Sequence, residues 1–302
     1  MSFTAKDVIE LREKTGCGMM DCKKALVEAG GDQRRAIDLL REKGLAAAAK
    51  KAGRIAAEGL IVAKVKPELK NGAIIEVNSE TDFVAKNADF IRFVDDCAEV
   101  VIDKAPVNLD ELLACKLGDR SVEEVLKEKI LVIGENLKIR RFRRLDGVLY
   151  SYVHGEGRIG VLVKFCVEET VASSEEFRTM AKNVALQIAA VNPIYLDKES
   201  VPAEVIDSEK QIFMARAMNE GKAQNIAEKM VLGRIAKFYK ENCLLEQEFI
   251  KDASLSLGAY VEGIASQLQT NISIVEFVRF ERGEGLVKKE DNFAQEVANM
   301  IK

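Results

Sequence analysis

Short apolar runs that each begin at a glycine predict two pairs of β-strands along this chain. The first pair covers 59–65 and 72–78, and the second covers 147–153 and 160–166. The glycines that open each pair, at 59 and 72 and at 147 and 160, stand 13 positions apart in both cases. Apolar runs of this length are typical of strands. The equal spacing therefore predicts two equivalent hairpins.

Helix-period stretches follow both strand pairs, at 90–106 and at 177–193. Two similar segments, 136–142 and 271–277, each follow a further apolar helical stretch. Each copy thus consists of strand, strand, helix, helix and strand. This order predicts an α+β fold with two related core subdomains, 56–146 and 147–280, each a small antiparallel sheet covered on one face by helices.

The second copy carries an insertion. Phe90 and Asn136 stand 46 positions apart, whereas Phe177 and Asn271 stand 94 apart, which leaves 48 extra residues. Residues from about 202 to 244 are charged and helix-rich with a turn at 219–221, so we predict an antiparallel helical hairpin. Periodicity favours a seam that only holds the hairpin together over a partner-binding face. Its expected apolar residues are Val205, Ile212, Ala215, Ile226, Met230, Ile235 and Phe238.

The first 55 residues predict a compact three-helix module. Thr4, Asp21 and Asp32 can cap helices 5–14, 22–28 and 33–43, with glycines 16, 30 and 44 near the exits. Met19 and Met20 then lie in the first loop, where we expect one of them to pack into the module, although an exposed methionine would also suit a protein-binding surface. Residues 45–54 are expected to form a helical linker, and a last helix is expected at 291–301, within a C-terminal module 281–302. The module's core is expected to contain Val8, Leu11, Ala25, Leu26, Ile37 and Leu40.

Composition indicates a soluble multi-domain protein. The chain has 302 residues, of which 48% are hydrophobic, and no apolar run reaches the length of about 18 that a membrane span needs. Its first 16 residues are charged and amphipathic rather than a secretion signal, so we expect a cytoplasmic location. The six cysteines are scattered without a Cys-x-x-Cys pair, which predicts free thiols.

Charge and motif content exclude several classes of function. A net charge of -4 argues against nonspecific nucleic-acid binding, and the basic run 138–144 fits a solvated sheet face with ion pairs better than an RNA-binding strand. A single histidine, His154, leaves little acid–base or metal chemistry, so we expect no metal, cofactor or enzymatic activity. The G-x-G-x-x-G at 155–160 opens a strand, not a helix, and indicates a turn. Direct nucleotide binding is not expected.

The junction at 76–87 carries the strongest functional signal. Thr81 or Asp82 can cap a helix after the strand at 73–77, and Phe83 then falls in its first turn. The repeat places Thr170 at the position equivalent to Phe83, which weakens the view that the ring closes a core. Because an apolar residue is most often buried, the residues alone leave both an exposed ring and a core ring open.

The junction resembles the Thr-Asp-Phe-Val signature of the elongation factor Ts family, bacterial guanine-nucleotide exchange factors for elongation factor Tu. The likeness is collinear over nearly the whole chain. It departs from the family at the hairpin tip, which is one residue longer, and over 239–257. The N-terminal module also resembles a ubiquitin-associated-type fold. The other matching segments are 14–24, 133–136, His154, 226–230 and 280–285.

The resemblance implies a partner and contact residues. A member of this family binds elongation factor Tu carrying GDP and stabilises its nucleotide-free state, so that GTP can replace GDP. Asp82 and Phe83, flanked by Thr81 and Val84, are implied to enter the partner near its Mg²⁺ and nucleotide. One-to-one and two-to-two complexes occur in the family, which leaves self-association open. Further contacts are implied for Arg12, Met19, Met20, Lys23 and His154.

Two other classes compete with this interpretation. A protein- or RNA-associated scaffold would use the N-terminal module and the helical hairpin to assemble larger complexes. An enzyme comes third, because the chain offers no paired-carboxylate motif and almost no imidazole.

Overall fold

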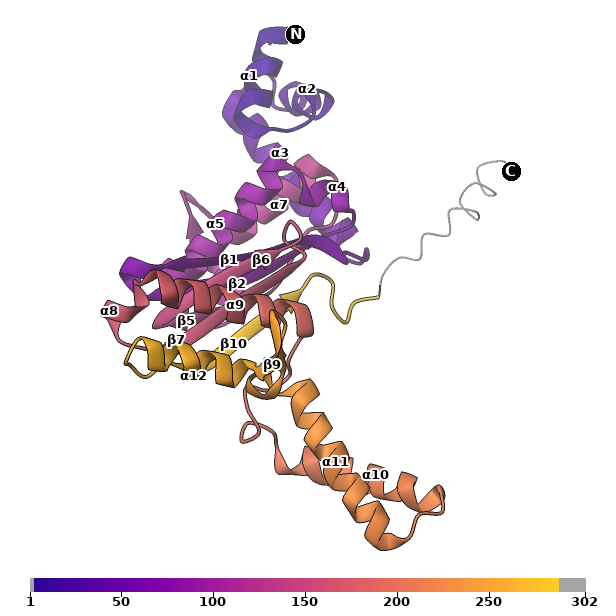
Figure 1. The fold of residues 1–302 in the computed structure, drawn as a ribbon. Helices are drawn as coiled ribbons and strands as arrows, with labels where there is room; N and C mark the ends of the chain where they lie inside the picture. The colour runs from indigo at the N-terminus through magenta and orange to yellow at the C-terminus, as the bar shows by residue number, and fades with distance from the viewer. Residues whose placement is uncertain (1–2, 288–302) are drawn as a thin grey trace.

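Two three-stranded antiparallel sheets form the centre of the computed structural model, which describes residues 3–287 (Figure 1). Each sheet uses the first, second and last strand of one predicted copy, in the same spatial order. The predicted strands are confirmed. They are β1 (Glu58–Lys66), β2 (Asn71–Ser79) and β5 (Lys138–Asp146) in the first sheet, and β6 (Val148–His154), β7 (Ile159–Cys166) and β10 (Ser273–Glu281) in the second.

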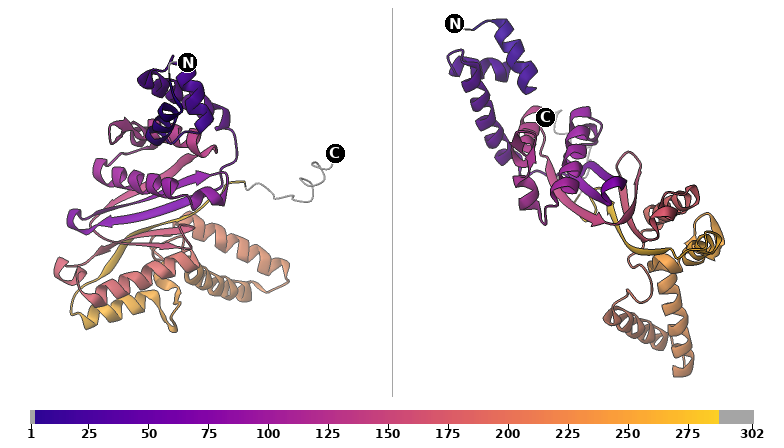
Figure 2. Two further views of the ribbon diagram at one scale, coloured as in Figure 1. Left: turned by 90° about the horizontal axis from the view of Figure 1, so that it is seen from above. Right: turned by 90° about the vertical axis from the view of Figure 1, so that its left-hand side faces the viewer.

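Amphipathic helices cover the outer face of each sheet (Figure 2). Phe90 and Phe93 of α5 (Ala88–Lys104) are buried against the first sheet, and Phe177 and Met180 of α9 (Glu175–Val191) against the second. Both helices begin two residues before their predicted starts, because the side chains of Asn87 and Ser174 accept hydrogen bonds from their first-turn amides. The other covering helices are α7 (Val122–Ile133) and α12 (Leu257–Gln267).

The inner faces of the two sheets pack against each other, which the sequence did not predict. Ile61, Ile74 and Leu162 meet Leu145 and Phe280 in a separate, smaller apolar core between the sheets. β7 can approach β1 only because residue 160 is glycine: an added Cβ would lie 2.4 Å from Ile61 Cγ2. The result is a stack of helices, sheet, sheet and helices. Shorter elements in the connections are η1 (Pro67–Leu69), α4 (Asp82–Ala85), α6 (Leu109–Ala114), β3 (Lys116–Leu117), β4 (Arg120–Ser121), α8 (Glu169–Ala172), η2 (Leu244–Glu246), β8 (Glu248–Phe249) and β9 (Asp252–Ser256).

A buried carboxylate joins the two sheets. Glu76 in β2 has no exposed surface, and it accepts hydrogen bonds from Arg140 at 3.0 Å, Arg141 Nε at 2.6 Å and the Gly283 amide at 2.8 Å. Strict alternation predicts opposite faces for the two arginines. A β-bulge opposite Glu76 lets both reach it instead. The expected ion pairs of the basic run are therefore confirmed, but this pair is largely buried rather than on a solvated face.

The N-terminal module has three helices, α1 (Ala5–Thr15), α2 (Met19–Glu28) and α3 (Gln33–Lys51). Two predictions about it are wrong. α2 begins at Met19 with Gly18 as N-cap, since the Asp21 and Cys22 amides already bond to the Gly18 carbonyl. α3 does not end at Gly44, which is buried against Leu131 of α7, so the helix and the expected linker are continuous.

The inserted hairpin is confirmed as α10 (Ala203–Asn219) and α11 (Gln224–Asn242), which project from the second subdomain (Figure 1). Its predicted seam is partly wrong, because Ile212 and Ile226 are 56% and 49% exposed. Apolar residues occur all round both helices, so their spacing alone does not select a face. The buried seam consists of Ile206, Ala217, Ala227, Val231 and Ile235.

Other predictions can be checked in the described residues. All six cysteines are free thiols, as expected. No helix within 3–287 combines the length and apolar character needed to cross a membrane. The predicted helix at 291–301 lies outside the described residues, and the domain boundaries at 55, 146 and 280 stay predictions.

Removing the Glu76 carboxylate should destabilise the fold strongly. In Glu76→Ala, two partly buried guanidinium groups lose their ion pair and the Gly283 amide loses its acceptor. Breaking a buried ion pair costs about 3–5 kcal/mol, and we expect a loss of that order in the free energy of unfolding, measured with urea. Glu284→Ala is the matched control: Glu284 also contacts Arg141, at 3.0 Å, but is 44% exposed, so its loss should be below about 1 kcal/mol. Equal losses would contradict this ranking.

The difference in the free energy of unfolding between Glu76→Ala and the unmodified protein should also become smaller at acid pH. Burial raises the pKa of the Glu76 carboxyl, but bonds from Gly283, Asn78 and Arg141 outweigh burial and lower the pKa overall. A lowered pKa in the folded state gives stabilisation that is present above the unfolded-state pKa of about 4.3 and is lost as the pH falls through the folded-state pKa. Urea unfolding of both proteins at pH 7 and at pH 3 measures this difference. The same difference at both pH values would contradict a lowered pKa for Glu76.

Candidate partner-binding surface

The turn between β2 and α5 presents Phe83 to solvent on a fixed base. Only residues 80 and 81 separate the end of β2 from the start of α4, and Ser79 Oγ donates to the Thr81 carbonyl at 2.8 Å. Val84 and Ala85 are buried, and Val84 belongs to the core of the first subdomain. Phe83, between them and the strand, is 79% exposed. The structure thus decides for the exposed ring.

Thr81 occupies the N-cap position of α4, but its side chain does not cap the helix. Its hydroxyl donates to Glu135 Oε1 at 2.6 Å, and its amide donates to Glu135 Oε2 at 3.0 Å. Asp82 follows as an exposed carboxylate, 3.7 Å from Lys86 one helical turn away. An ion pair of this kind is weak, so the Asp82 carboxylate remains available to a partner.

A groove of about 700 Å³ separates α4 from the tip of the β6–β7 hairpin. It brings Asp82 close to the residues that follow His154, which sequence spacing could not establish. His154 itself is exposed, and its Nδ1 lies 3.0 Å from the Tyr152 hydroxyl. The groove is lined by Leu60, Asp82, Ala85, Lys86, Ile91, Gly155, Glu156, Arg158 and Arg282.

The hairpin tip is fixed to β1 of the first sheet and to the turn that follows β10. The Gly157 carbonyl accepts from the Ile61 amide at 2.9 Å, and the Arg158 carbonyl accepts from the Arg282 amide at 2.9 Å. The G-x-G-x-x-G segment is therefore a turn between strands, as predicted. Within 3–287, no group of three or more His, Cys, Asp or Glu side chains could hold a metal ion.

A second exposed surface lies on the N-terminal module. Met19 and Met20, in the first turn of α2, are 41% and 60% exposed, so both present part of their surface to solvent and neither belongs to the buried core of the module. Arg12 on α1 and Lys23 on α2 are also exposed. Sequence reasoning missed Val27, which is 59% exposed and lies seven residues after Met20, on the same side of α2.

Comparison with known proteins decides the family. The family model for Elongation factor TS matches residues 80–284. Proteins named Elongation factor Ts are 52% identical in Clostridium perfringens, 50% in Clostridium kluyveri and 48% in Clostridium botulinum, each over 99% of both chains. This chain belongs to the elongation factor Ts family. The elongation factor Ts family supplies the nucleotide exchange factor for elongation factor Tu in translation elongation, so this protein is an exchange factor rather than an enzyme.

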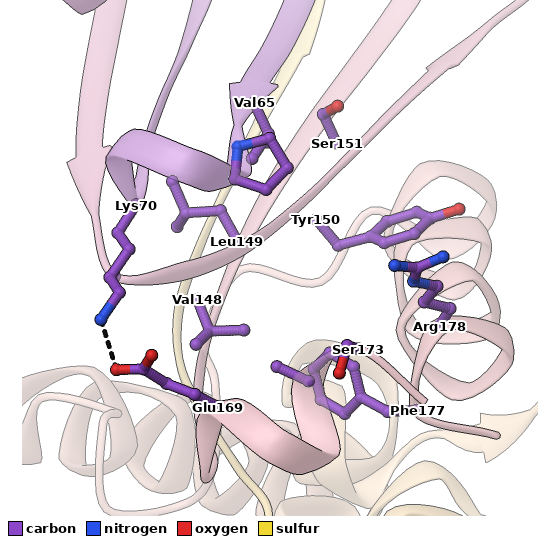
Figure 3. A pocket seen from close by; sticks show the side chains of 13 residues that line it. Val65, Lys70, Val148, Leu149, Tyr150, Ser151, Glu169, Ser173, Phe177 and Arg178 are labelled. Carbon is purple, nitrogen blue, oxygen red and sulfur yellow. Dashed lines mark hydrogen bonds and ion pairs between the residues drawn. The ribbon is translucent and has the colours of Figure 1, made fainter. Parts of the chain in front are cut away.

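Another groove, of about 510 Å³, lies away from this surface of the elongation factor Ts chain (Figure 3). It is bounded by the β1–β2 connection, β6, α8 and the start of α9, and an ion pair between Lys70 and Glu169 stands at its edge. None of the site residues implied by the elongation factor Ts resemblance lines it. Figure 1 places α8 and α4 at opposite ends of the two sheets.

Replacing Gly157 should disturb the hairpin tip of this elongation factor Ts member more than replacing Gly155. Both have positive φ, at +86° and +59°, so alanine strains the backbone in each. An added Cβ at 157 would lie 2.1 Å from Leu60 Cδ1 and 3.2 Å from the Ile61 carbonyl, whereas at 155 it meets only Arg158 Cβ at 3.5 Å. We expect Gly157→Ala to cost about 1–3 kcal/mol more than Gly155→Ala in urea unfolding. Equal losses of unfolding free energy in the two variants would contradict this prediction and show that the side chains around Leu60 can move aside.

Proposed function

We propose that the Asp82–Phe83 turn enters the nucleotide-binding domain of elongation factor Tu and causes GDP to leave. The exposure of Phe83 carries this proposal. A large apolar ring that is 79% exposed, on a turn held by buried Val84, gains nothing from its own fold. The second copy supports the same view, because α8 starts 87 positions after α4 and carries exposed Thr170 where α4 carries the ring.

The two side chains have different tasks in this proposal. Phe83 wedges between helices of the partner's nucleotide-binding domain and buries its ring there. Asp82 brings a negative charge towards the Mg²⁺ that secures the diphosphate oxygens, so it competes with them for the cation. Neither step makes or breaks a covalent bond.

Nucleotide exchange requires that this protein bind two states of its partner with unequal affinity. Since a ligand shifts an equilibrium only by its differential affinity, this protein must bind the nucleotide-free partner more tightly than the GDP-bound one. Contacts that persist in both states hold the complex together. We assign these to Arg12, Met19, Met20 and Lys23 on the N-terminal module and to His154. An exposed methionine adapts its shape to a partner surface, and linked contact regions raise the effective concentration of one another. We infer that exchange takes place in the cytoplasm.

Phe83→Ala should slow stimulated GDP release without unfolding the protein. Burying a phenylalanine ring is worth about 1.5–3 kcal/mol, so we expect the maximal release rate at saturating factor to fall by about 10- to 100-fold. Stopped-flow release of a fluorescent GDP analogue from elongation factor Tu measures this rate. Val107→Ala is the matched control, because Val107 is also 79% exposed and lies in the same subdomain. An unaltered maximal rate for Phe83→Ala would leave a scaffold role.

Asp82→Asn should slow release in a manner that depends on Mg²⁺. The amide keeps the shape of the side chain but removes the charge that competes for the cation. We expect a rate decrease of about tenfold in millimolar Mg²⁺ and a much smaller one after chelation with EDTA. Asp89→Asn is the control, since Asp89 is an exposed acid in the first turn of the neighbouring α5. An equal decrease with and without Mg²⁺ would contradict the assigned role.

A further inference from the structure

Two neighbouring pairs of residues interlock at the base of the exposed turn. The Glu135 carboxylate accepts the Thr81 hydroxyl on Oε1 at 2.6 Å and the Thr81 amide on Oε2 at 3.0 Å. In return, Glu80 Oε1 accepts the Asn136 amide at 2.6 Å. Three hydrogen bonds to carboxylates therefore join the residues just after β2 to those just before β5. Bonds to an ionised acceptor are roughly twice as strong as neutral ones.

This interlock limits how α4 can be oriented. A helix of four residues has almost no stability of its own, so its direction is set by what holds its two ends. Glu135 holds Thr81 at the start, and the core holds Val84 near the end. Asp82 and Phe83 are the two residues between these fixed points.

The repeat shows that the fold does not need this interlock to make a strand-to-helix junction. In the second copy, Glu168 stands where the first has Thr81, and Thr270 stands where the first has Glu135. Both line an open groove of about 1120 Å³, and among the described residues no hydrogen bond joins them. Even so, β7 still leads into α8, which carries Thr170 in the position of Phe83. The interlock and the ring occur together, in the same copy.

The segment that follows the N-terminal module contacts the same residues, Glu80 and Asn136. Arg54, three residues beyond α3, lies 3.4 Å from Glu80, and its carbonyl accepts from Asn136 Nδ2 at 2.8 Å. The chain that leads from the methionine-bearing module and the turn that carries Phe83 therefore share one anchoring point.

We infer that Glu135 is a positioning residue for nucleotide exchange: through Thr81, it fixes the direction in which Asp82 and Phe83 enter the partner. The inference rests on the function proposed for that turn. Glu135 itself need not touch the partner, and its carboxylate is used on both oxygens within this chain. Its loss should therefore affect the rate at which bound factor expels GDP more than the affinity of the complex.

The test is stopped-flow GDP release with the full-length protein carrying Glu135→Ala. We expect the maximal rate to fall by about tenfold, because a small misplacement of an acting group is costly. The factor concentration that gives half the maximal rate should change by less than about threefold. Glu123→Ala is the matched control: Glu123 is an exposed acid on α7 that pairs with Lys127 at 2.6 Å. An unchanged maximal rate for Glu135→Ala would overturn the inference.

Glu135→Gln separates orientation from charge. Its Oε1 can accept from the Thr81 amide and its Nε2 can donate to the Thr81 hydroxyl oxygen, so both bonds can form without a charge. We expect it to keep the maximal rate within about twofold of the unmodified protein. A rate as low as that of Glu135→Ala would show that the charge acts by itself, against a positioning role. Thr81→Val, which removes one of the two bonds, serves if Glu135→Ala proves poorly folded, and it should give an intermediate rate.

A combined variant decides whether Glu135 acts through the turn. If it does, adding Glu135→Ala to a protein that already carries Asp82→Asn and Phe83→Ala should slow release by less than about twofold beyond that protein alone. A further tenfold decrease would overturn the positioning role. An unaffected rate in Phe83→Ala alone would instead overturn the function proposed for the turn, so the two failures are distinguishable.

Discussion

The buried carboxylate of Glu76 is the constraint on which the arrangement of the two sheets depends. A buried charge is tolerated only when several donors satisfy it, and here the donors come from β2, β5 and the turn after β10. Arg141 contributes a second contact, since its guanidinium lies 4.2 Å from the centre of the Phe280 ring. One residue of the first sheet therefore determines where the end of the second sheet lies.

Fixed sheets give the exposed turn a fixed base. The middle of β2 is held by Glu76, and the region just beyond its end is held by Glu135 through Thr81 and by Val84 in the core. Opposite α4, the β6–β7 tip is bonded to β1 and to Arg282. Asp82 and the hairpin tip therefore face one groove from two subdomains. A surface of this kind can act on a partner because little of the binding energy is lost in ordering it.

The two copies of the duplicated framework differ in their surface residues and in one inserted segment. The first copy has the exposed ring and the Glu135–Thr81 contact, whereas the second has small or exchanged residues at those positions and the inserted helical hairpin. Both copies keep the same strand order, so these differences affect the surface and not the framework. The internal repeat thereby serves as a built-in comparison for separating what the fold needs from what the function uses.

The sequence by itself determined the strands, the long helices, the hairpin insertion and the turns at glycines, because each depends on residues close together in the chain. It also named Phe83 but left its exposure open, since an apolar residue suits core and surface alike. Only the tertiary structure decided that exposure, the packing of one sheet on the other, and which hairpin residues form the seam. It alone paired Glu135 with Thr81, 54 positions away, and Glu76 with Gly283, 207 positions away. Contacts of this kind depend on which segments the packing brings together, and local pattern carries no information about that.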